Sequence, residues 1–171
     1  MLTRKEQFLV LADEHGLTVY DKLPSEYPIN GLYIEKGERK IILMKASLPD
    51  SKYIPVLIEE IGHYVASQGV VVELDGVDCI KSENYGRSWA IEYLLPICKF
   101  TFASVLFGCQ TSADYAEAFS LDEEFVKDAI EYHKQKGNWM NSFETFFQLL
   151  AKPNYREILR RNKMKSKDGL L

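Results

Sequence analysis

The sequence lacks the patterns that mark several common classes of protein. Its three cysteines, Cys79, Cys98 and Cys109, are odd in number and far apart, so they indicate neither a C-x-x-C zinc ribbon nor a disulfide framework. The first residues do not follow the basic-then-apolar order of a secretory signal peptide. No apolar run reaches the roughly 18 residues that a membrane-spanning helix needs. These absences predict a protein of the reducing cytoplasm that has no membrane partner.

An excess of positive charge is also missing. The chain has 21 Lys and Arg against 25 Asp and Glu, for a net charge of −4. Proteins that bind duplex DNA through many phosphates carry a basic face, so direct nucleic-acid binding is not expected. Basic residues do gather near the C-terminus, where a solvated helix end and tail is favoured over a nucleic-acid arm. They are Arg156, Arg160, Arg161, Lys163, Lys165 and Lys167.

Several catalytic signatures are absent as well. No G-x-S-x-G, P-loop or G-x-G-x-x-G pattern occurs, so the chemistries that depend on them have no support. What is present is the composition of an ordinary globular protein, with 46% hydrophobic and 27% charged residues in 171. A chain of this length can bury a core large enough to fold unaided.

Local patterns predict an α+β fold with a short N-terminal sheet, a helix that carries the candidate site and a mostly helical C-terminal half. Thr3 and Glu6 have the spacing of a capping box for a first helix. Two apolar runs around a Gly-containing turn predict a β-hairpin over 31–44. We expect one domain over 1–137 and a helical extension with a basic tail over 138–171. Further helices are expected over 51–67, 83–95, 99–106, 112–119, 122–136, 142–150 and 154–162, with short extended segments over 17–20 and 70–72.

The helix over 51–67 has two distinct sides. At about 100° per residue, a narrow apolar stripe should face the core. Glu59 and His63 lie one turn apart on the other side, where both can point at one object. The apolar stripe consists of Ile54, Ile58, Ile61 and Val65.

The segment 59–63 reads E-E-x-x-H, a variant of the metallopeptidase motif H-E-x-x-H. In that motif the first and last residues bind the metal, and the second takes a proton from water. Glu59 therefore stands at the first ligand position, Glu60 at that of the general base and His63 at that of the second ligand. In isolation, the same pattern is typical of any solvated face of an amphipathic helix.

Glu83 opens the next predicted helix. Arg87 and Ala90 lie on the same face of that helix, and the small Ala90 permits a close approach to the preceding helix. The Glu83 carboxylate can then reach the Glu59/His63 pair as a third ligand. An ordinary first-turn acid that favours the helix dipole is an equally good interpretation.

Taken together, these residues resemble the ImmA/IrrE family of small metallopeptidases, which occur in bacteria and in their phages and mobile elements. The resemblance covers roughly 31–137. Its parts are the hairpin, the motif helix Ile58-Glu59-Glu60-Ile61-Gly62-His63-Tyr64, Glu83, the pair Trp89-Ala90, the stop Leu94-Leu95-Pro96 and a helical stretch over 115–132.

The resemblance implies a zincin-like fold in which Glu59, His63 and Glu83 bind zinc and Glu60 is the general base. It implies a peptidase that acts on a DNA-binding repressor of a phage or mobile element. The alternative is a catalytically inactive relative that binds a regulator without cutting it. Two carboxylates and one imidazole offset both charges of Zn²⁺, and carboxylates suit another divalent metal such as Mn²⁺. We therefore expect modest activity or weak zinc retention.

Other residues of interest have plainer interpretations. His15 and His133 are expected at the surface. Tyr64, Tyr85 and Tyr93 could polarise a substrate carbonyl, but buried packing is the favoured interpretation for these tyrosines. The stretch 112–130 resembles a helix–turn–helix, but its acidic residues would repel phosphates, so packing is favoured over DNA reading.

Overall fold

The computed structural model of the chain describes residues 2–67 and 76–137, and for 76–83 the course of the backbone alone. The chain divides into two compact units at the Leu94–Leu95 bond. Helices and a small sheet together confirm the predicted α+β class. The expected segments 70–72, 142–150 and 154–162 lie outside the described residues, as does the expected extension 138–171.

The N-terminal unit begins with helix α1 (Arg4–Glu14), which has the predicted capping box. The Thr3 hydroxyl accepts a hydrogen bond from the Glu6 backbone N–H, and the Glu6 carboxylate accepts one from the Thr3 N–H. These two bonds satisfy donors that a helix start leaves without partners. Gly16 follows the helix with a φ of +71°, a conformation that a residue without a Cβ adopts at little cost.

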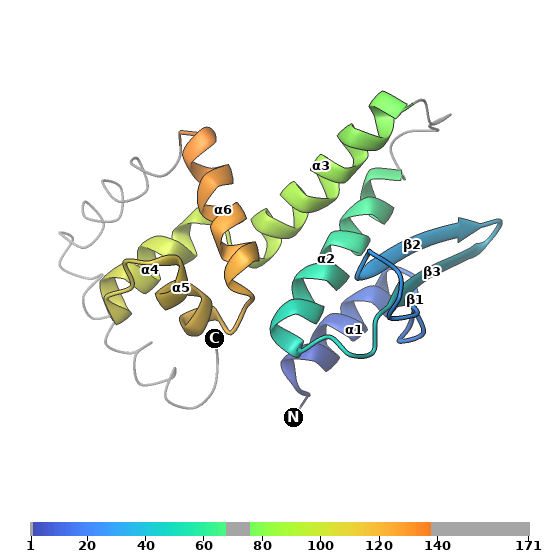
Figure 1. Ribbon diagram of the computed structural model, residues 1–171, viewed down its shortest axis with the longest axis horizontal. Helices are drawn as coiled ribbons and strands as arrows, with labels where there is room; N and C mark the ends of the chain where they lie inside the picture. Colours follow the sequence, from blue (N-terminus) through green and yellow to red (C-terminus); the bar gives the residue numbers. More distant parts are fainter. Residues whose placement is uncertain (1, 68–75, 138–171) are drawn as a thin grey trace. The chain divides into compact units, whose positions relative to one another are not determined.

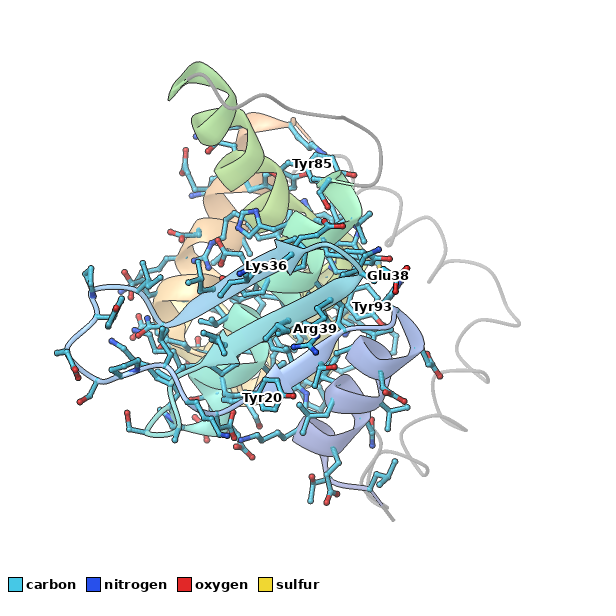
Figure 2. All side chains as sticks on the ribbon, turned by 90° about the vertical axis from the view of Figure 1, so that its right-hand side faces the viewer. Tyr20, Lys36, Glu38, Arg39, Tyr85 and Tyr93 are labelled. Carbon is cyan, nitrogen blue, oxygen red and sulfur yellow. The ribbon has the colours of Figure 1, made fainter. Side chains whose placement is uncertain are left out.

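A three-stranded sheet follows in the order β1-β3-β2, so that β2 is an edge strand. β3 pairs in parallel with β1 and antiparallel with β2. Lys36 pairs with Arg39 at the hairpin end, and Gly37 has a φ of +62°, as the predicted Gly-containing turn requires. Figure 2 shows the outward side of this sheet, with Tyr20 on β1 and the hairpin residues labelled. The strands are β1 (Thr18–Tyr20), β2 (Gly31–Lys36) and β3 (Arg39–Met44).

Helix α2 (Asp50–Ser67) lies between the sheet and helix α3 (Figure 1). Three of the four residues of its predicted apolar stripe are buried, since Ile54 is 2% exposed and Ile58 and Ile61 are 0% exposed, whereas Val65 is half-buried. Ile42 and Met44 of β3 are also fully buried. Burial of these side chains holds the helix on the sheet through the hydrophobic effect.

Helix α3 (Gly76–Leu94) begins earlier than the sequence analysis predicts. The residues over 77–82 include neither proline nor glycine, so nothing in them ends a helix. Glu83 therefore lies about two turns inside α3. Its interpretation as a first-turn acid is wrong, because the helix dipole acts mainly on the terminal turn.

The C-terminal unit contains three helices in its described part, arranged around aromatic side chains. The ring of Phe100 contacts those of Tyr115, Phe119 and His133 at centroid distances of 5.1, 5.7 and 5.9 Å. A Thr111/Asp114 capping box starts the middle helix. The elements are α4 (Ile97–Phe107), α5 (Ser112–Phe119) and α6 (Glu123–Gln135), close to the predicted ranges.

His133 is not a surface residue as the sequence analysis predicts. Its side chain is 0% exposed, and its Nε2 lies 2.8 Å from the Leu95 carbonyl oxygen. The charged sequence around it conceals an amphipathic helix, because His133 follows the buried Val126 and Ala129 at helical spacing. His15, by contrast, is exposed as predicted.

Tyr85 and Tyr93 also differ from the prediction, because they are 48% and 45% exposed. Both residues belong to α3 and are labelled in Figure 2. Tyr93 stacks on Trp89 at a centroid distance of 5.2 Å and meets Phe8 of α1 edge-on at 6.4 Å. Tyr93 thus packs with one side of its ring while remaining partly in solvent.

No helix within the described ranges is by itself long and apolar enough to cross a membrane. Taken together, Asn84–Leu94 and Ile97–Phe107 would meet that length and composition. The cytoplasmic location remains a prediction from the sequence.

The buried position of His133 can be tested by substitution. His133→Ala removes a buried ring and its hydrogen bond to Leu95, so it should lower the free energy of unfolding by about 3 kcal/mol. Urea unfolding followed by circular dichroism measures this change. The matched variant His15→Ala removes an exposed ring and should change stability by less than about 1 kcal/mol. Equal effects of the two substitutions would contradict the buried position.

Candidate functional site

Two glycines face each other where α2 packs against α3. A Cβ added to Gly62 would lie 2.9 Å from the Gly86 carbonyl oxygen and 3.1 Å from its Cα. Such distances are too short for a close-packed interior, so any larger residue at position 62 would push the helices apart. Ala90, which the sequence analysis held responsible for the close approach, is buried, but the glycines make the tightest part of this contact possible.

His63 lies against the second of these glycines. A Cβ on Gly86 would lie 2.6 Å from Cε1 of the His63 ring and within 2.9 Å of both ring nitrogens. The imidazole therefore occupies the space that a side chain at position 86 would need. Glycine costs up to about 1 kcal/mol relative to alanine inside a helix, and room for His63 is the physical reason for it here.

Glu59 makes an ion pair across the same helix interface. An Nη1 of Arg87 on α3 donates a hydrogen bond to Oε2 of Glu59 at 2.8 Å. The side chains are 29% and 20% exposed, respectively, so water screens the pair less than it would a pair at the surface. Glu59, the residue at the first motif position, is thus already paired with the guanidinium of Arg87.

Glu83, the third predicted ligand, lies on α3, one helical turn before Arg87. Its side chain is outside the described residues, and its role as a ligand remains a prediction. Among the side chains that are described, no group of three or more His, Cys, Asp or Glu is placed to hold a metal. The described part of the site is therefore the pair Glu59 and His63 on α2 together with Gly86 and Arg87 on α3.

Glu60 points toward the sheet rather than toward α3. Its Oε2 accepts a hydrogen bond from the backbone N–H of Tyr33 on β2 at 2.7 Å, and the residue is only 9% exposed. Burying a carboxylate is costly unless hydrogen bonds compensate. A bond of this kind, from a backbone N–H to an ionised acceptor, is among the stronger ones. The predicted general base is consequently fixed in position by the edge strand.

Gly31 makes this position of Glu60 possible. A Cβ at Gly31 would lie 2.6 Å from Cγ1 of Val56 and 2.9 Å from both Cγ and Oε1 of Glu60. Any side chain at position 31 would displace the carboxylate from β2. The hairpin thus supplies both the open space and the N–H donor that hold Glu60.

Tyr33 adds a polar and aromatic border on this side of α2. Its hydroxyl donates to Oε2 of Glu35 at 2.7 Å, and its ring meets that of Tyr64 at 5.9 Å. Burial, followed by the nearby Glu35 carboxylate, raises the pKa of Tyr33 to about 12. The hydroxyl therefore stays protonated at neutral pH. The ring of Tyr64 also lies 4.7 Å from the ammonium group of Lys40, within the range of a cation–π interaction.

Comparison of the chain with protein-family models, with curated proteins and with solved structures gives no match. The residues of the site and the resemblance of their pattern are therefore the basis for inferring a function.

Several residues of the site carry no role in the sequence analysis. Arg87 is noted there only as a neighbour on the Glu83 face, and neither Gly31 nor the Tyr33 N–H is considered. Gly86 has no role in the predicted site either. Glycine inside a helix signals a close approach of another group, and that signal applies to both Gly62 and Gly86.

The glycine contact predicts a specific stability effect. Gly62→Ala should lower the free energy of unfolding by about 1–3 kcal/mol, because the added Cβ meets the backbone of α3. The intrinsic preference of helices for alanine acts in the opposite direction. Asn84→Ala, at an exposed position of α3, is the matched control and should be neutral or slightly stabilising. Urea unfolding of both variants compares them, and a stabilising Gly62→Ala would show that the helices do not pack through this glycine.

Proposed function

We propose that this chain is a metal-dependent, zincin-like peptidase that acts on a DNA-binding repressor or a similar regulator of a phage or mobile element. The observation that carries the proposal is the Glu60 carboxylate, buried and fixed by the Tyr33 N–H. A position with a purely structural role has no need of a buried charge, since an apolar side chain would fill the space at lower cost. A general base, in contrast, must be held in a defined position.

The residues around Glu60 have the chemistry that such a site needs. Glu59 and His63 lie one turn apart on α2, and α3 carries Glu83 in the helix that packs against them. Carboxylate and imidazole donors fit Zn²⁺ and, with two carboxylates, also Mn²⁺. Glu59, His63 and Glu83 would hold the metal. A bound divalent cation supplies Lewis-acid polarisation of a peptide carbonyl.

In the proposed reaction, Glu60 acts as the general base. Its carboxylate takes a proton from the attacking water and delivers it to the leaving amine of the cleaved peptide bond. The Tyr33 N–H keeps the carboxylate from rotating away, and the low exposure limits competition from bulk water. A repressor as substrate follows from the resemblance to the ImmA/IrrE family.

The second candidate is a peptidase-like protein that binds a regulator without cutting it. The Glu59–Arg87 ion pair favours it, because a carboxylate in contact with a guanidinium is a weaker ligand for a metal. Both candidates use the same fold, and they differ in whether Glu60 performs chemistry.

The variant Glu60→Gln separates the two functions. It keeps an acceptor for the Tyr33 N–H but cannot take a proton, so we expect cleavage of the repressor to fall by a factor of about 100 or more. Cleavage is measured with purified protein, added Zn²⁺ or Mn²⁺ and candidate repressors, with fragments identified by mass spectrometry. Derepression of a reporter gene measures the same step in cells.

Glu38→Gln, at the exposed hairpin end, is the matched control and should cleave at the normal rate. Undiminished derepression by Glu60→Gln would instead support the binding protein. Binding of less than about a tenth of an equivalent of any transition metal, even in excess, would exclude the metal site itself.

A further inference from the structure

Arg87 occupies a place in the candidate site that the predicted metal ligands do not explain. Its guanidinium donates to Glu59 at 2.8 Å, from the helix turn that follows Glu83. A cation so near a predicted divalent metal repels it, and the repulsion is large at partly buried positions. An arginine here therefore needs a reason beyond a surface ion pair.

The charge of Glu59 supplies that reason. A zinc site with two histidines and one glutamate keeps one net positive charge, because only one ligand is anionic. With Glu59 in place of the first histidine, the ligands carry two negative charges. The net charge of the metal and its ligands together is then zero. Adding the positive charge of Arg87 returns the total to one positive charge.

We propose that Arg87 is a charge-compensating residue of this site: the Glu59–Arg87 ion pair acts as a nearly neutral ligand that takes the place of the first histidine of H-E-x-x-H. The inference rests on the proposed function, since it assumes that Glu59, His63 and Glu83 bind a metal. Arg87 is a positioning residue in this scheme. It holds one carboxylate oxygen of Glu59 and leaves the other oxygen for the metal.

Two observations favour compensation of the Glu59 charge by Arg87 over competition between Arg87 and the metal for Glu59. A carboxylate has two oxygens with several lone pairs, so one hydrogen bond to Oε2 leaves capacity at Oε1. In addition, the pair is only partly buried, with the Glu59 side chain 20% and the Arg87 side chain 29% exposed, so neither side chain is enclosed on all sides.

Zinc affinity of the full chain, measured by competition with a chromophoric chelator, tests the proposal without any substrate. Arg87→Gln removes the repelling charge, so it should bind zinc at least about tenfold more tightly, equivalent to about 1.4 kcal/mol. Arg87→Lys keeps the charge and should stay within about threefold of the natural protein. The control Arg39→Gln makes the same change of charge at the exposed hairpin end and should leave zinc affinity unchanged.

The outcomes separate this inference from the proposed function. If the natural protein binds zinc and Arg87→Gln binds it equally or more weakly, charge compensation is overturned. The metal site itself then stands. Weaker binding by both Arg87 variants would show that the arginine only orients Glu59, and would also overturn it. No zinc binding by any variant would overturn the metal site and the proposed function together. Circular dichroism checks that each variant folds. If Arg87→Gln does not fold, Arg87→Lys still provides a decisive test.

Discussion

The contact between α2 and α3 at Gly62 and Gly86 is the constraint on which the candidate site depends. With no Cβ on either residue, the backbones approach to distances that another residue pair would prevent. That approach places the His63 ring over Gly86 and brings Glu59 within hydrogen-bonding distance of Arg87. The site therefore exists because two helices pack through glycine at this one point.

Two sides of α2 carry different residues of the candidate site. The side that faces α3 carries Glu59 and His63, while Glu60 faces the edge strand and its Tyr33 N–H. On the opposite side of the helix, Ile54, Ile58 and Ile61 of the apolar stripe are buried and fix its rotation. A helix held in this way cannot turn, so a ligand pair and a general base can be kept on neighbouring sides of it. Gly31 completes the arrangement by leaving space for the carboxylate.

Much of the fold follows from local patterns in the sequence. The Thr3/Glu6 capping box, the hairpin with Gly37 in its turn and the period of the apolar residues in α2 predict their elements to within a few residues. Three predictions failed: the start of α3 at Glu83, the surface position of His133 and the burial of Tyr85 and Tyr93. The sequence analysis predicts no helix start at Gly76, and the polar neighbours of His133 hide its buried position. In these two cases contacts between elements decide the outcome, because local preferences are weak.

By itself, the sequence determined the elements and the order of Glu59, Glu60 and His63 along one helix, because hydrogen bonding and side-chain periodicity act over a few residues. Only the tertiary structure decided the partners of those residues. The bonds from Arg87 to Glu59 and from Tyr33 to Glu60 join residues 28 and 27 positions apart. No local spacing encodes such a pairing, since it arises when burial of the apolar stripe and the glycine contact bring separate elements together.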